Sequence, residues 1–162
     1  STWAPQLEVY VSRFAEREIP AHQLDILQQM GVAVHSGTIP AFGEAADLIL
    51  DGLIGYSLSG HPRGITAELM RWANQQNTPI LALDTPSGID LSSGTIYNPV
   101  IEAVATLTLA LPKVGLFREA AAAKVGELYL GDISVPPQLY ASPALQLKVG
   151  PIFAESDIVR LQ

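Results

Sequence analysis

The feature that most constrains this chain is a pair of short apolar runs, each associated with an aspartate at a turn. The first run, Leu48–Leu53, contains Asp51, and the second, Pro79–Leu83, is followed directly by Asp84. Between them Gly64–Gln76 has apolar residues at helical spacing. Short apolar runs flanking an amphipathic helix predict two parallel strands of a βαβ unit. Because ligands of parallel α/β sheets bind outside the carboxyl ends of the strands, both aspartates are expected at one crevice.

The rest of the chain continues this alternation. Runs rich in apolar and β-branched residues predict four more strands, and helical spacing predicts two more helices. The expected strands are Leu7–Val11, Val32–His35, Ala103–Leu111 and Glu127–Ile133, and the expected helices are Ala21–Met30 and Arg118–Lys124. Pro136–Tyr140 predicts a helical turn, and the residues beyond it carry weak signals. Alternating strands and helices predict an α/β fold, a three-layer αβα sandwich around a mostly parallel sheet, with residues 1–162 forming one domain.

Composition excludes several classes of function. No apolar run is long enough to cross a membrane, and no basic patch accompanies the net charge of -7, so neither a membrane nor a nucleic acid is expected as a partner. The absence of cysteine excludes disulfides, thiolate nucleophiles and cysteine metal sites. We expect a cytoplasmic protein.

The turn Asp84–Asp90 (DTPSGID) is the sharpest local signal for chemistry. Asp84 ends a buried strand, a position suited to acid/base work. Pro86 and Gly88 predict a tight turn that directs Ser87 and Asp84 toward the same space. In the alternative interpretation, Asp84 only accepts hydrogen bonds from loop amides. The second aspartate turn on the neighbouring strand favours the functional interpretation.

The segment Gly55–Gly64 joins a strand to a helix and is rich in glycine and serine. Exposed backbone N–H groups and the following helix N-terminus suit an anion such as phosphate, which Arg63 would pair with. An ordinary turn that needs glycine for its backbone angles is an equally good interpretation. Asp51 is likewise open to two interpretations, a cation ligand or a carboxylate that accepts hydrogen bonds from the loop. Lys113 would reach a phosphate, steer a carboxylate, or simply be solvated.

Three motifs together resemble the NAD(P)H-hydrate epimerase family, also called the YjeF N-terminal domain. They are DGLIGYSLSGHPRG (Asp51–Gly64), LALDTPSGID (Leu81–Asp90) and LTLALPKVGLF (Leu107–Phe117). The resemblance extends more weakly from Leu7 to Ile133, and it implies a Rossmann-like fold. Enzymes of this family interconvert the R and S hydrates of NADH and NADPH, bind K⁺ and form homodimers. The resemblance therefore implies an isomerase that acts on NAD(P)H hydrate, with K⁺ as cofactor and a second copy as partner.

Matched position by position, the family's site falls on ten residues of this chain. Its potassium ligands fall on Asp51 and Ser87, and its acidic substrate residue falls on Asp84, to which we assign the acid/base role. The substrate-binding loop comprises Gly55, Tyr56, Ser57, Leu58, Ser59, Gly60 and His61.

Two departures from the family pattern leave an alternative function open. The family's asparagine- and glycine-rich loop would precede Leu7 and is not in the sequence, so we expect the domain to lack its first βα unit. Tyr56 and Ser57 stand where many members have Thr and Gly. These departures favour a non-catalytic nucleotide- or protein-binding module of the same fold as the alternative. A weaker one is an unrelated nucleotide-binding α/β domain. The apolar tail Val135–Leu147 predicts self-association, unless it covers its own sheet.

Overall fold

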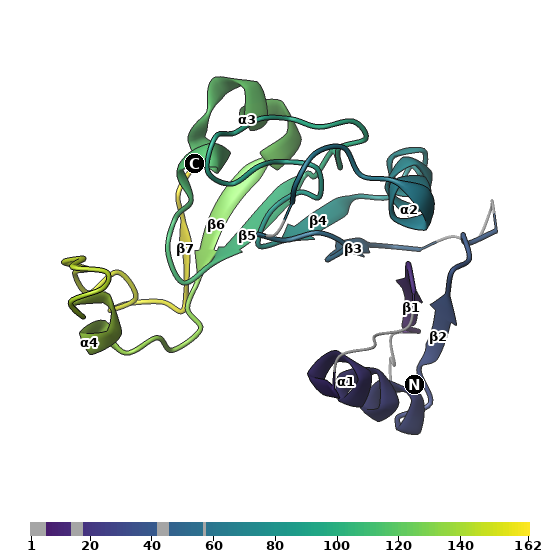
Figure 1. Cartoon of the computed structure of the whole chain (residues 1–162), viewed down its shortest axis with the longest axis horizontal. Helices are drawn as coiled ribbons and strands as arrows, with labels where there is room; N and C mark the ends of the chain where they lie inside the picture. Colours follow the sequence, from purple (N-terminus) through teal and green to yellow (C-terminus); the bar gives the residue numbers. More distant parts are fainter. Residues whose placement is uncertain (1–5, 14–17, 42–45, 57) are drawn as a thin grey trace.

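Two sheets organise the chain in the computed structural model, which describes residues 6–13, 18–41, 46–56 and 58–162 (Figure 1). The smaller sheet has two strands, β1 and β2, and the larger has five, in the order β3-β4-β5-β6-β7. The elements in chain order are β1 (Glu8–Val11), α1 (Glu18–Gln29), β2 (Ala33–Ser36), β3 (Ile49–Asp51), α2 (Gly64–Asn74), β4 (Ile80–Leu83), β5 (Ala105–Leu109), the 3-10 helix η1 (Val114–Phe117), α3 (Glu119–Val125), β6 (Glu127–Gly131), α4 (Pro137–Tyr140) and β7 (Ile158–Arg160).

The larger sheet is parallel from β3 to β6, and β7 joins its edge antiparallel to β6. In the pairing of β3 with β4, Asp51 lies opposite Ala82. Asp51 is the last residue of β3 and Asp84 directly follows β4, so the two aspartates lie at neighbouring strand ends, as the sequence predicts. The expectation of a mostly parallel α/β fold is confirmed.

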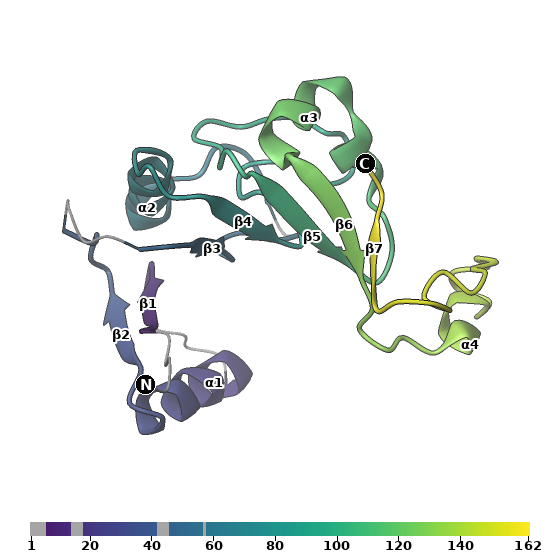
Figure 2. The same cartoon turned by 180° about the vertical axis from the view of Figure 1, so that it is seen from behind.

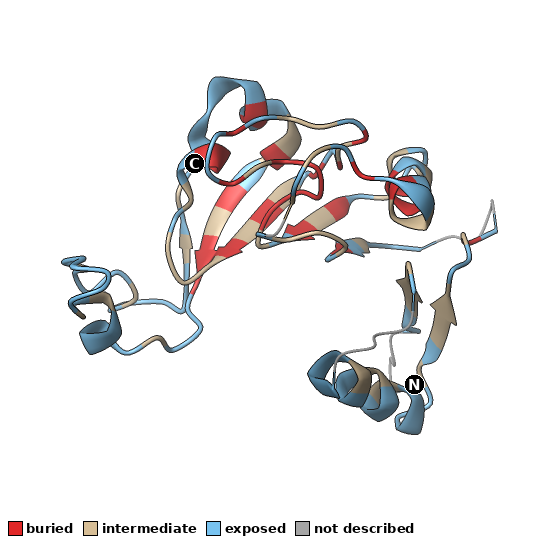
Figure 3. Cartoon of the chain, in the orientation of Figure 1, coloured by how far each residue is buried: buried red, intermediate tan, exposed pale blue. Residues whose placement is uncertain are grey.

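Consecutive strand order explains why α2 and α3 lie on the same face of the larger sheet (Figures 1 and 2). Parallel connections are right-handed, so a chain that advances in one direction across a sheet places every crossover on one side. Met70 of α2 packs with Ile80 and Ile101, and Val125 of α3 packs with Leu128. Figure 3 shows the buried positions gathered along β4–β6, α2 and the turns between them.

The opposite face of the larger sheet is apolar and open within the described residues. Leu50 is 65% exposed and Leu83 is 51% exposed. The five-stranded sheet therefore has one helical layer in the described part of the chain.

The N-terminal unit β1-α1-β2 lies apart from the larger sheet, beyond its β3 edge (Figures 1 and 2). Its two strands are parallel, and the rings of Tyr10 and His35 stack with centroids 4.5 Å apart. Helix α1 begins at Glu18, three residues before the predicted start, because Pro20 is tolerated in the first turn of a helix.

Two further differences from the sequence expectations concern the carboxyl-terminal half. β7 was not predicted, because only three residues form it and its pairing with β6 is not encoded in local periodicity. Strands β5 and β6 are each shorter than their apolar runs. None of the helices in the described ranges combines the length and apolar character that a membrane span requires.

Candidate functional site

A pocket of about 600 Å³ lies where strands β4, β5 and β6 end. Asp84 follows β4 and Lys113 follows β5, and both line the pocket together with Gly55 and Tyr56 from the loop after β3. Most of the remaining wall is apolar, contributed by the ends of β4 and β5 and by residues that follow β6. The pocket lies at the carboxyl ends of the strands, as the sequence predicts, but of the two aspartates expected there only Asp84 lines it.

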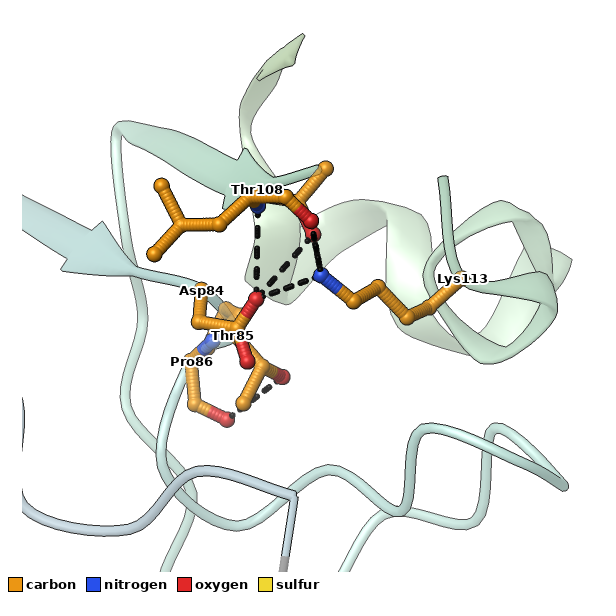
Figure 4. Close-up of polar contacts among 6 residues, drawn as sticks. Asp84, Thr85, Pro86, Thr108 and Lys113 are labelled. Carbon is orange, nitrogen blue, oxygen red and sulfur yellow. Dashed lines mark hydrogen bonds and ion pairs between the residues drawn. The ribbon is translucent and has the colours of Figure 1, made fainter. Parts of the chain in front are cut away.

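Asp84 is held through one of its two carboxylate oxygens (Figure 4). Oδ1 accepts hydrogen bonds from Lys113 Nζ at 2.6 Å, from the Leu109 backbone N–H at 3.3 Å and from Thr108 Oγ1 at 3.5 Å. No described residue donates to Oδ2. The backbone of Asp84 has φ 70°, a left-handed conformation that is costly for a non-glycine residue and concentrated at functional sites. Asp84 therefore presents one anchored oxygen and one that a ligand can use.

Lys113 is a pocket residue whose contacts the sequence leaves undecided. Its ammonium group donates to Asp84 Oδ1, to the Leu109 carbonyl at 2.7 Å and to Thr108 Oγ1 at 3.0 Å. These three contacts match the three donors of an ammonium group, so Lys113 is directed at Asp84 and not at solvent. In the sequence, only the position of Lys113 after the strand next to β4 indicated that it could reach the site, and this position did not identify Asp84 as its partner.

Asp51 and Ser87 are joined by hydrogen bonds, and neither of them lines the pocket that contains Asp84. Ser87 donates its backbone N–H to Asp51 Oδ2 and its hydroxyl to Oδ1, both at 2.7 Å, and the Leu53 N–H adds a bond of 3.2 Å. Burial raises the pKa of the Asp51 carboxyl above its ordinary value, and these hydrogen bonds oppose the rise only in part. The structure thus leaves a buried carboxylate that would benefit from a cation.

The oxygens around Ser87 suit a hard cation. Asp51 Oδ1 and the Ile54 carbonyl lie 2.7 and 3.4 Å from Ser87 Oγ, and oxygen ligands are those that hard cations prefer. No cluster of three or more His, Cys, Asp or Glu side chains arranged for a metal occurs among the described residues. Any cation at this position would therefore rely on the single carboxylate together with hydroxyl and carbonyl oxygens.

The structure divides the expected substrate loop into two parts. Gly55 and Tyr56 line the pocket, whereas Leu58, Ser59, Gly60 and His61 do not. The end of the loop is held elsewhere: His61 Nδ1 accepts the Asn98 N–H at 3.0 Å, and the His61 ring contacts the Tyr97 ring edge-on with centroids 5.4 Å apart. Ser57 lies outside the described residues.

Comparison with known proteins decides the family. The family model described as YjeF-related protein N-terminus matches residues 6–115. The chain belongs to this family. The family resemblance seen in the sequence is thereby confirmed. Asp51, Asp84 and Lys113 all fall within the matched region.

Members of the YjeF-related family with curated names are similar over much of the chain. An NAD(P)H-hydrate epimerase of Dehalogenimonas lykanthroporepellens is 42% identical over 144 residues, covering 89% of this chain and 56% of that protein. An NAD(P)H-hydrate epimerase of Rhodopirellula baltica is 36% identical over 113 residues, covering 70% of this chain and 45% of that protein. The chain thus spans about half the length of these relatives.

A solved structure supports the fold. The crystal structure of the yeast protein ynu0 superposes with a TM-score of 0.70 at 20% identity, covering 95% of this chain and 65% of that one. At this identity the likeness concerns the fold alone. It confirms the Rossmann-like α/β architecture expected for a YjeF-related domain.

Proposed function

We propose that this YjeF-related domain is an epimerase that interconverts the R and S forms of NADH and NADPH hydrate. The observation that carries the proposal is the Asp84 carboxylate, which lines a pocket at the strand ends with Oδ1 anchored by Lys113 and Oδ2 without a donor among the described residues. Relatives named NAD(P)H-hydrate epimerase, 36–42% identical to this chain, support the choice of substrate.

The reaction inverts the ring carbon that carries the added hydroxyl. Asp84 would give a proton to that hydroxyl, which leaves as water while the ring nitrogen lone pair forms a C=N bond. Water then adds to either face of the iminium ion, and the released proton returns to Asp84. The two epimers have the same atoms and the same oxidation state, so a positioned acid/base is the main chemical requirement.

The loop after β3 would bind other parts of the dinucleotide. Gly55 and Tyr56 lie in the pocket beside Asp84. Helix α2 begins at Gly64, and the N-terminus of an eleven-residue helix carries partial positive charge that favours a phosphate group. The exposed Arg63 precedes it and is available to pair with the same group. We include the intervening residues Ser57 to His61 in this proposed binding loop.

We propose K⁺ as the cofactor, held by Asp51 and Ser87. Support comes from the donor set, a buried carboxylate beside a hydroxyl and the Ile54 carbonyl. When bound, K⁺ would supply the positive charge that the buried Asp51 carboxylate lacks. Ser87 and Asp51 would in turn fix the turn that leads from Asp84, because Ser87 lies three residues after it.

We also propose that the protein is a homodimer and works in the cytoplasm. Leu145 and Leu147 of the tail are 48% and 43% exposed, and apolar surface of this kind favours association. The cysteine-free sequence is compatible with the cytoplasm. Light scattering of the full-length protein at micromolar concentration tests the dimer, and a strictly monomeric result would exclude it.

The function is tested with a single epimer of the substrate. The full-length protein is incubated with pure R hydrate of NADPH in buffer containing K⁺, and the S hydrate is followed by chromatography. We expect equilibration far faster than the spontaneous rate. Conversion at the spontaneous rate alone would contradict the proposal, and tight binding of the hydrate without conversion would support the non-catalytic binding module instead.

A further inference from the structure

The segment that follows β6 forms one wall of the pocket that contains Asp84. Ile133 and Val135 line the pocket, and so do Leu139 and Tyr140 of α4. All four side chains are apolar or aromatic, and they join Asp84 in a single pocket although they come from a separate part of the chain. We name the four lining residues Ile133, Val135, Leu139 and Tyr140 the tail wall.

The backbone turns sharply after each of the three strands that end at the pocket, and the last of these turns leads into the tail wall. Three non-glycine residues with left-handed backbones follow three successive strands: Asp84 after β4 (φ 70°), Ala110 after β5 (φ 64°) and Ser134 after β6 (φ 59°). Such conformations are strained and persist where the surrounding structure determines them, commonly at ligand sites. The Ser134 N–H donates to Asp132 Oδ1 at 2.7 Å, which stabilises the turn from β6 into the tail wall.

Local hydrogen bonds shape the backbone of the tail beyond this turn. The Leu139 N–H donates to the Pro136 carbonyl at 2.9 Å, and the Tyr140 carbonyl accepts the Leu147 N–H at 2.8 Å. Both bonds join residues within the tail, and the pocket lining places Leu139 and Tyr140 beside Asp84. Leu139 nevertheless remains 54% exposed, and Tyr56, which lines the same pocket, is 76% exposed.

The chemistry of the pocket indicates which part of a ligand meets the tail wall. Its charged groups are the paired Asp84 and Lys113, and the tail wall adds no charge. The reacting portion of a ligand must approach Asp84, so the portion that shares the pocket with Asp84 is the ring that undergoes reaction. The ring of a hydrated nicotinamide is uncharged and largely apolar on its faces, which suits contacts with leucine and tyrosine side chains.

We propose that Leu139 and Tyr140, together with Tyr56, form the specificity wall that holds the hydrated nicotinamide ring against Asp84. This inference rests on the proposed epimerase function and adds to it a ring-binding role for the tail after β6. The residues bind and orient the ring, while proton transfer remains with Asp84. Leu139 and Tyr56 carry exposed apolar surface that contacts with the ring faces would cover.

Equilibrium binding in an Asp84→Asn background tests the wall without turnover. The ligands are pure NADPH hydrate and the hydrate of reduced nicotinamide mononucleotide, which lacks the adenosine half, with affinity measured by calorimetry in the full-length protein. We expect Leu139→Ala and Tyr140→Ala each to raise Kd by about 10-fold for both ligands, since each removes an apolar contact made on binding. Gln138→Ala, on the same helix but outside the pocket lining, is the matched control and should leave Kd unchanged.

Three outcomes would overturn the inference. An unchanged Kd for both Leu139→Ala and Tyr140→Ala would show that these side chains do not contact the ligand. A rise in Kd seen only with the dinucleotide would show that they contact its adenosine half and not the nicotinamide ring. Tyr140→Phe should bind like the parent, so a loss as large as that of Tyr140→Ala would show that the hydroxyl and not the ring face makes the contact. Thermal melting confirms the fold of each variant, and Leu139, being half exposed, gives an independent test if Tyr140→Ala unfolds. If the parent protein epimerises the hydrate but the tail variants bind it normally, the ring-binding inference is wrong while the proposed epimerase function stands.

Discussion

Ser87 donates two hydrogen bonds of 2.7 Å to Asp51, one to each carboxylate oxygen, across 36 residues of sequence. Both side chains are buried, with 0% and 2% exposure. This pair ties the turn after β4 to the end of β3, and Ser87 Oγ extends the connection by accepting the Ile54 N–H at 2.9 Å. The two turns that carry the proposed chemistry are thus one hydrogen-bonded unit.

Removing the Ser87 hydroxyl should destabilise the fold. Ser87→Ala leaves the buried Asp51 carboxylate with one donor fewer and the Ile54 N–H without its acceptor. The expected loss in free energy of unfolding is roughly 1–3 kcal/mol, typical for a buried polar group left unsatisfied. Urea denaturation at neutral pH measures it. Ser92→Ala, at an exposed position in the neighbouring turn, should change the free energy of unfolding by no more than about 0.5 kcal/mol. Equal effects of the two variants would argue that the hydrogen bonds between Ser87 and Asp51 do not stabilise the fold.

Stability should depend on pH in opposite ways through Asp51 and Asp90. Burial raises the pKa of Asp51, so above the ordinary carboxyl value of about 3.9 the folded chain retains a proton that the unfolded chain has lost. The contribution of Asp51 to stability therefore falls as pH rises from that value through the raised folded pKa. The free energy of unfolding of the parent minus that of Asp51→Asn should fall across this window in urea titrations.

Asp90 provides the control of opposite sign. Hydrogen bonds from the backbone and hydroxyl of Ser93 hold the pKa of the Asp90 carboxyl below its ordinary value. Its contribution to stability is therefore present above the ordinary carboxyl pKa and is lost as pH falls through the folded pKa. The difference between the parent and Asp90→Asn should accordingly rise with pH. A difference for Asp51→Asn that also rises would mean that hydrogen bonding to Asp51 outweighs its burial.

Asp84→Asn should abolish epimerisation while the protein stays folded. The amide keeps the size of the carboxylate but cannot cycle a proton, and loss of a positioned acid/base costs roughly 10²–10⁴-fold in rate. Asp51→Asn should behave differently, with weaker K⁺ dependence or weaker substrate binding that high K⁺ partly relieves. Steady-state rates over a K⁺ series, with circular dichroism as the folding check, separate the two roles. Near-normal turnover by well-folded Asp84→Asn would rule out Asp84 as the acid/base.

Lys113 should act through Asp84. Lys113→Met removes the ammonium group 2.6 Å from Asp84 Oδ1, and we expect a fall in kcat of about 10-fold or more, the effect of losing one charge-assisted hydrogen bond. The double variant Asp84→Asn/Lys113→Met should be no slower than Asp84→Asn alone, because Lys113 then has no carboxylate to position. Lys124→Met removes a comparable ion pair, with Glu102, outside the pocket and should leave kcat unchanged. Additive losses in the double variant would show that Lys113 acts independently of Asp84.

The sequence by itself determined the elements whose signals are local. Strand β4, Ile80–Leu83, lies within the predicted apolar run Pro79–Leu83, and α2 begins at the predicted Gly64. The positions of Asp51 and Asp84 near neighbouring strand ends followed from the same patterns. Apolar periodicity reports these features because burial of one face of a helix or strand constrains neighbouring residues directly. The three motifs also sufficed to identify the family.

Only the tertiary structure decided which residues meet. The bond between Lys113 and Asp84, the attachment of β7 to β6 and the return of Leu139 and Tyr140 to the pocket all join residues remote in sequence. Such contacts depend on strand order, on the direction of each turn and on hydrogen bonds between separate elements, none of which leaves a periodic trace. The tail shows this most clearly. Its scattered apolar residues predict an association surface, which stays a prediction, and only the tertiary structure shows that Leu139 and Tyr140 also line the pocket with Asp84.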